Sequence, residues 1–131
     1  MKGSIEAAVA RRCMSSFGSI NDFHNTADRT LEVLQDAFDE LDETSEGIDC
    51  NLSDGVLTVT LGSAGTWVLN KQTPNRQLWW SSPLSGPKRF EYGGAGWQGT
   101  RDGEALEELL ENEVSEAVGN DIDVDWEAIG P

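Results

Sequence analysis

The apolar residues change their spacing twice along this chain of 131 residues, and that change limits the possible folds more than any other feature. Between about Asn21 and Asp42 they recur every three or four residues, which predicts an amphipathic helix. Its apolar face consists of Phe23, Ala27, Leu31, Leu34, Phe38 and Leu41. From Ile48 the spacing becomes two, and near Asp102 or Gly103 it returns to the helical spacing. The expected order is therefore helix, strands, helix.

The middle of the chain contains short strand-like runs separated by turn residues. In chain order they are IDCNL, GVLTVTLG, GTWVLNKQ, RQLWWSS, PKRFEY and GWQGT. Their close succession predicts an antiparallel meander. The second helix has an apolar stripe of Leu106, Leu109, Leu110, Val114, Ala117 and Val118. A sheet with one apolar face takes both helices on that face, so we expect an α+β two-layer sandwich in the order α-β-β-β-β-β-β-α.

The turn TPNR predicts which side chains of the fold point away from the helices. Pro74 suits the second position of a turn, which favours a symmetric hairpin. Such a hairpin pairs Gln72 with Gln77, Asn70 with Trp79 and Leu69 with Trp80. Trp80 then belongs to the core, whereas Trp79 lies among amides on the open face, where it is suited to anchor a partner. With an odd number of loop residues, the two tryptophans would exchange faces.

Charge is distributed unevenly along the chain. There are 24 acids against 9 bases, which gives a net charge of −15. Residues 22–54 hold eleven acids with Arg29 as the one base, and residues 102–131 hold eleven acids and no base. Between these two segments, Lys71, Arg76, Lys88, Arg89 and Arg101 accompany a single acid, Glu91. A strongly acidic field repels nucleic acid and anionic lipid, and it attracts cations or basic protein surfaces.

The acids could serve solubility alone. However, like charges four residues apart on a helix are unfavourable by about 0.2–0.5 kcal/mol per pair, and a solvating helix face would normally interleave Lys or Arg. In the first helix, Arg29 is the one base among these acids. The segregation of charge therefore indicates a functional surface.

Several function classes lack support in the sequence. Cys13 and Cys50 form no close pair and have no neighbouring histidine, which argues against zinc and thioredoxin-like sites and favours a reducing compartment. His24 is the one histidine of the sequence, so no conventional catalytic triad is expected and we assign no catalytic residue. The longest apolar runs are too short to cross a bilayer, so no membrane partner is expected.

The first twenty residues differ in composition from the rest. They are rich in Ala, Ser and Arg with a single acid, which is typical of a mitochondrial transit peptide remnant or of a disordered leader. We therefore expect residues 1–20 to lie outside the fold and residues 21–131 to form a single domain.

The segment GTWVLNKQTPNRQLWWSSPLSGPKRFEY, with SDGVLTVTLG before it and DGEALEELLENEV after it, resembles the frataxin family over residues 21 to about 118. The resemblance implies the helix–sheet–helix fold and an iron-binding protein of iron–sulfur cluster assembly in the mitochondrial matrix. It places an acidic ridge at Asp36, Asp39, Glu40, Glu43, Glu46 and Asp49. It places a partner-binding surface at Asn70, Gln72, Gln77, Trp79 and Arg89, called here the sheet surface. Gly47 stands where many members have an acid.

Carboxylate oxygens are hard ligands that suit iron(II) or iron(III), and equally calcium or manganese. Exposed carboxylates on a helix supply few protein ligands per ion, so we expect weak, exchangeable iron binding. His24 beside Asp28 is an alternative site containing nitrogen, although a histidine without a metal role is the favoured interpretation. At the end of the chain, Trp126 and Ile129 are expected to pack between the helices.

Three functions remain open. The protein can be an iron chaperone and allosteric activator of a cysteine desulfurase and its scaffold protein, a ferroxidase, or an iron store that works by assembling. Ferritin-like ferroxidase centres use buried Glu and His ligands, including a Glu-x-x-His motif that this sequence lacks. The chaperone and activator function is therefore favoured, and a monomer is the expected state. Iron-dependent oligomers would be expected if the protein is an iron store.

Overall fold

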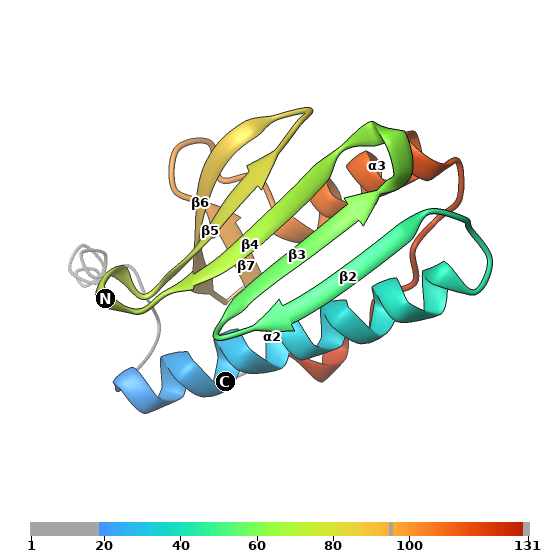
Figure 1. The fold of residues 1–131 in the computed structure, drawn as a ribbon. Helices are drawn as coiled ribbons and strands as arrows, with labels where there is room; N and C mark the ends of the chain where they lie inside the picture. Colours follow the sequence, from blue (N-terminus) through green and yellow to red (C-terminus); the bar gives the residue numbers. More distant parts are fainter. Residues whose placement is uncertain (1–18, 95, 130–131) are drawn as a thin grey trace.

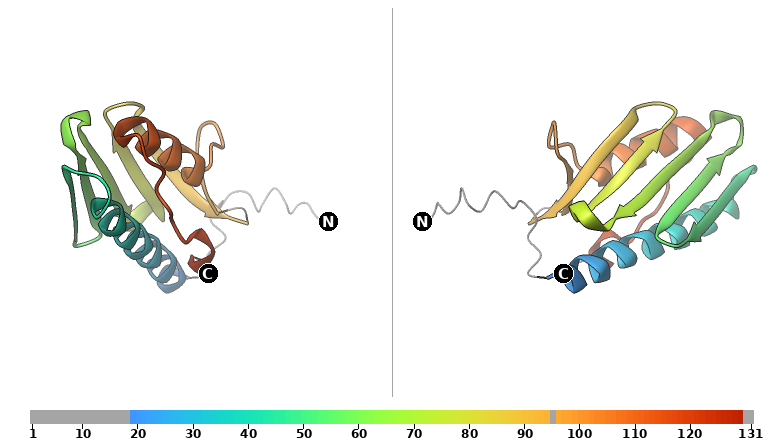
Figure 2. Two further views of the ribbon diagram at one scale, coloured as in Figure 1. Left: turned by 90° about the vertical axis from the view of Figure 1, so that its right-hand side faces the viewer. Right: turned by 60° about the vertical axis from the view of Figure 1, so that its left-hand side comes forward.

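The computed structural model describes residues 19–94 and 96–129 (Figure 1). The helices are α2 (Ile20–Asp42) and α3 (Leu106–Val118). The strands are β2 (Ile48–Ser53), β3 (Val56–Leu61), β4 (Thr66–Gln72), β5 (Gln77–Ser82), β6 (Gly86–Gly93) and β7 (Gly96–Gly99). They form one antiparallel sheet in chain order, and both helices cover the same face of it (Figures 1 and 2). The predicted α+β sandwich is confirmed. Of the expected leader, residues 1–18 lie outside the described residues.

Helix α2 is held by a capped start and by a buried apolar face. Ser19 has an extended backbone, and its Oγ accepts a hydrogen bond from the Asp22 backbone N–H at 3.1 Å, which satisfies one of the free donors of the first turn. The predicted apolar face is buried along its whole length. Thr30 is buried with it and accepts a hydrogen bond from the Trp97 indole at 2.9 Å. The acidic side of the helix is left facing solvent.

The hairpin between β4 and β5 has the predicted register. Asn70 lies opposite Trp79, Leu69 opposite Trp80, and Gln72 opposite Gln77. The turn is a short 3-10 helix, Thr73–Asn75, closed by Arg76 in the left-handed conformation at φ 53°. Trp80 is consequently 3% exposed and lies in the core, whereas Trp79 is half-buried on the opposite face. The assignment of the two tryptophans is confirmed.

Helix α3 begins at Leu106, and the predicted start at Asp102 or Gly103 was wrong. The backbone N–H of Gly99 donates to the carbonyl of Glu104 at 2.8 Å, and Gln98 forms a bridge with Ala105. Residues 102–105 thus make a turn that continues the edge of the sheet before the helix can begin. Helical periodicity does not reveal this, because the turn is stabilised by pairing with β7.

Gly47 has a conformational reason to be glycine. Its φ is +81°, which side chains rarely adopt, and a Cβ there would lie 3.3 Å from the Cα of Gly62. The Gly62 N–H also donates to the Gly47 carbonyl at 2.8 Å. An acid at this position would therefore strain the connection between α2 and β2.

The C-terminal segment returns along the helical layer (Figure 2, left). Ile122 and Val124 are buried, and Trp126 and Ile129 pack against the core, as expected for the last two. The Trp126 indole N–H donates to Glu111 Oε2 at 2.7 Å, which connects the segment to α3.

Candidate functional site

The acidic ridge follows the second half of α2, the connection after it and the start of β2. All six of its carboxylates are exposed: Asp36, Asp39, Glu40, Glu43, Glu46 and Asp49. In the described part of the chain, no three His, Cys, Asp or Glu side chains are grouped so that they could hold a metal ion. Any ion on the ridge would therefore receive few protein ligands and keep much of its water.

Cys50 adjoins the ridge without extending its ligand set. Its thiol is half-buried on β2, and burial, reinforced by the nearby charges of Asp39 and Asp49, raises its pKa to about 11. The thiolate is the form that binds metals, so the raised pKa makes Cys50 a poorer metal ligand than an ordinary thiol.

The alternative nitrogen-containing site is occupied by a side chain of the protein itself. The Lys71 ammonium lies 2.7 Å from Asp28 Oδ1 and 3.0 Å from His24 Nδ1. An ammonium between these two groups repels a metal cation and occupies the position it would need. The interpretation of His24 and Asp28 as a metal site is thus not supported. The same contact explains why a lysine occurs on the helix-facing side of β4.

The sheet surface is organised around Trp79. The guanidinium of Arg89 lies over the Trp79 ring at 4.6 Å from the ring centroid, a cation–π contact. The Trp79 indole N–H donates to Gln77 Oε1 at 2.8 Å, and Gln77 Nε2 donates to Glu91 Oε2 at 2.8 Å. These contacts hold the indole in one orientation while it remains half-buried. A rigid, partly exposed indole is well suited to bury area against another protein at low entropic cost.

The predicted residues of this surface differ in their exposure. Asn70 and Gln72 are half-buried on the same face, whereas Gln77 is 9% exposed and already uses both ends of its amide. Gln77 therefore positions Trp79 more than it offers a contact of its own. Glu91 was missed by the sequence analysis, although a single acid in a basic segment is a signal that it has a local partner.

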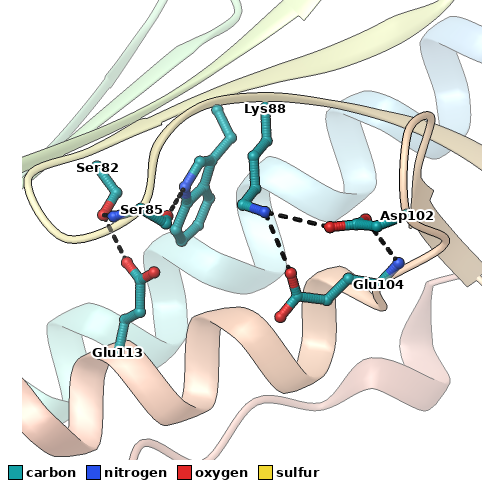
Figure 3. A network of polar contacts seen from close by, with 7 residues as sticks. Ser82, Ser85, Lys88, Asp102, Glu104 and Glu113 are labelled. Carbon is teal, nitrogen blue, oxygen red and sulfur yellow. Dashed lines mark hydrogen bonds and ion pairs between the residues drawn. The ribbon is translucent and has the colours of Figure 1, made fainter.

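A buried carboxylate supports the sheet from below (Figure 3). Glu113 of α3 is 7% exposed, and its Oε1 accepts hydrogen bonds from Trp67 Nε1 at 2.9 Å and Ser82 Oγ at 2.6 Å. Ser82 Oγ also accepts from the N–H groups of Leu84 and Ser85, so the carboxylate organises the turn between β5 and β6. Glu113 falls three residues after Leu110 on the buried stripe of α3, a position from which its burial, though not its hydrogen-bond partners, could have been expected.

The two candidate surfaces are separate. The ridge runs along α2 and the β2 edge of the sheet, whereas the sheet surface lies on the side of β4, β5 and β6 that the helices leave open (Figure 1). The protein can therefore bind one partner or ion through the carboxylates of the ridge and another through the sheet surface around Trp79. Among the described helices, none has the length and apolarity needed to traverse a bilayer.

Known proteins share this architecture and sequence. The family model for the frataxin-like domain matches residues 16–120. The mitochondrial frataxin of Caenorhabditis elegans is 43% identical over 118 residues, which are 86% of this chain and 87% of that protein. The mitochondrial frataxin of Dictyostelium discoideum is 46% identical over 109 residues, which are 80% of this chain and 56% of that protein, so this chain spans about half of its length.

A solved structure agrees with both. The trimeric frataxin of Saccharomyces cerevisiae, described as complexed with ferrous, has a TM-score of 0.67 and 36% identity, with 87% of this chain and 98% of that chain covered. The match of the family model to most of the fold, together with the C. elegans relative that this chain nearly spans, shows that the chain belongs to the frataxin family.

Proposed function

We propose that this protein binds iron weakly on its acidic ridge and acts in mitochondrial iron–sulfur cluster assembly. It delivers iron to a cysteine desulfurase and its scaffold protein in the matrix, and it activates that complex by docking through the sheet surface. The observation that carries the proposal is the rigid Trp79 on an open sheet face, remote from a fully exposed ridge of carboxylates.

The geometry of the ridge favours delivery of iron over its oxidation. Iron is cargo here, and exposed carboxylates that leave most of the ion hydrated release it readily. In the described residues, no group of carboxylates and histidine resembles a buried ferroxidase centre. An assembling iron store is a second candidate, because the yeast relative is trimeric. Light scattering during addition of iron(II) distinguishes an iron carrier from an iron store. The molecular mass of a carrier should stay that of a monomer, whereas the mass of a store should increase.

Replacing Trp79 by alanine tests the docking surface. The variant should lose about 2 kcal/mol of affinity for the reconstituted desulfurase–scaffold complex, as truncated interface anchors do, and sulfide production should fall with it. Binding is measured by calorimetry and sulfur transfer in a turnover assay. Thr58→Ala on the same face of β3 is the control and should bind normally. Unchanged binding and stimulation by the Trp79 variant would exclude this surface as the functional one.

Neutralising part of the ridge tests the iron site. Asp39→Asn, Glu40→Gln and Glu43→Gln together should weaken iron(II) binding in an anaerobic titration. They should also raise the free energy of unfolding, by about 0.2–0.5 kcal/mol for each pair of like charges relieved along α2. Amide signals of residues 36–49 should shift with iron(II) in the original protein, while those of the sheet surface stay unchanged. Iron affinity that survives the triple substitution would show that the ridge is not the site.

A further inference from the structure

A groove of about 620 Å³ crosses the open face of the sheet beside Trp79. Its lining includes Trp79, Asn70 and Ser81 on one side and Arg89, Thr100 and Arg101 on the other. Arg101 was not among the residues that the family resemblance assigned to the sheet surface. The groove therefore extends that surface beyond Arg89, across the end of β7.

The cations at the groove differ in whether they already have an acidic partner. Lys88 pairs with Asp102 at 3.4 Å and with Glu104 at 3.3 Å (Figure 3). These contacts raise the pKa of Lys88, and the hydrogen bond to Glu104 has the largest effect. The pKa of Asp102 is held below its usual range, mainly by the hydrogen bond from the Glu104 backbone N–H and also by Lys88. Within residues 19–94 and 96–129, no carboxylate lies within ion-pair distance of Arg89 or Arg101.

The backbone holds the two arginines close to each other. The Thr100 N–H donates to the Arg89 carbonyl at 2.9 Å, which continues the β6–β7 ladder past the end of β7. The Gly103 N–H then donates to the Gly99 carbonyl at 3.0 Å and turns the chain, so that Arg101 remains at the groove. Arg89 is additionally held against Trp79 by its cation–π contact. One face of the Arg89 guanidinium is thus occupied by the Trp79 ring, while its N–H groups can still donate to a planar acceptor such as a carboxylate.

We propose that this groove takes an acidic segment of the partner protein, with carboxylates held by Arg89 and Arg101 and an adjacent apolar side chain against Trp79. The inference rests on the proposed function and adds the chemistry of the partner to it. The net charge of −15 opposes long polyanions such as nucleic acid and anionic membranes, because their repulsion from the whole molecule accumulates. A short acidic segment instead contacts mainly the guanidinium groups of Arg89 and Arg101. Each of these groups can donate two parallel hydrogen bonds to one carboxylate.

The test measures binding of the reconstituted desulfurase–scaffold complex to single variants. Arg101→Gln and Arg89→Gln should each weaken affinity about tenfold, and Arg101→Glu should weaken it further. Arg101→Lys keeps the charge without the fork and should be intermediate. Arg76→Gln is the matched control, because it makes the same change in net charge from the turn after β4 and should alter affinity less than about twofold.

Ionic strength provides a second measurement. Raising potassium chloride from about 50 to about 300 mM should weaken binding of the original protein more than binding of Arg101→Gln. Melting temperatures of the Arg101 variants should match that of the original protein, since Arg101 is exposed, whereas Arg89→Gln should melt slightly lower because it loses the cation–π contact with Trp79.

The possible results separate this inference from the proposed function. If Arg101→Gln and Arg101→Glu bind normally while Trp79→Ala does not, the acidic segment is excluded and the docking surface stands. Equal losses of affinity for Arg101→Gln and Arg76→Gln would show that the change in net charge alone weakens binding. This result would also overturn the inference. If Trp79→Ala binds normally as well, the proposed function itself fails.

Discussion

Truncation of Trp80 to alanine should lower the free energy of unfolding by about 3–5 kcal/mol. The ring is 3% exposed and meets the Phe90 ring edge-on, with 6.4 Å between the centroids. Its indole N–H donates to Ser85 Oγ at 3.0 Å. Alanine would remove the aromatic volume from the centre of the sheet, leave a cavity beneath α3 and leave Ser85 without this donor. Denaturant unfolding followed by circular dichroism measures the loss.

The matched control is Trp79→Ala, one residue away on the opposite face. Its ring is half-buried, and the cation–π contact with Arg89 contributes only about 0.5–1 kcal/mol at an exposed site, so the stability loss should be far smaller. Comparing the stabilities of Trp80→Ala and Trp79→Ala therefore distinguishes a tryptophan needed for folding from one that serves docking. A larger loss for Trp79 than for Trp80 would contradict the assignment of the two faces.

Removal of the Glu113 side chain should have the second largest effect on stability. Glu113→Ala deletes a buried acceptor that serves both Trp67 and Ser82, and leaving buried donors unpaired costs about 1–3 kcal/mol each. We expect a total loss of about 3 kcal/mol in chemical denaturation. Backbone amides of Leu84 and Ser85 should also exchange faster with solvent, because Ser82 Oγ would no longer be held in place to accept from them.

Glu113→Gln is the control for this experiment. Glutamine keeps an oxygen where Oε1 lies, so it should preserve the hydrogen bonds from Trp67 and Ser82 at reduced strength and cost well under half as much as alanine. A loss equal to that of Glu113→Ala would contradict the interpretation, since it would show that the negative charge matters more than the acceptor.

The fold was predictable to the level of faces and register because both depend on local patterns. The spacing of Phe23, Leu31 and Leu41 specifies which side of α2 is buried, and the even-numbered turn around Pro74 places Trp80 in the core. The start of α3 was not predictable from periodicity, because the turn before it is stabilised by pairing with Gln98 on another strand.

The candidate surfaces could be proposed from the sequence as sets of residues, but not as interactions. Charge segregation indicated an acidic functional surface, and the family resemblance assigned the residues of both the ridge and the sheet surface. That Gln77 is nearly buried between Trp79 and Glu91 depends on the pairing of β5 with β6. The partner of Lys71 likewise depends on tertiary structure, because only the packing of α2 on the sheet brings Asp28 to it.

By itself, therefore, the sequence determined the order of the elements, their buried faces and the unequal distribution of charge. Each of these is set by residues a few positions apart. The tertiary structure alone decided which charges are neutralised and which remain free. Lys71 and Lys88 find carboxylates far away along the chain, and Glu113 finds its donors on two strands, only after the helices pack on the sheet. Arg89 and Arg101 line the groove on the open face of the sheet, and among the described residues no carboxylate lies within ion-pair distance of either guanidinium group.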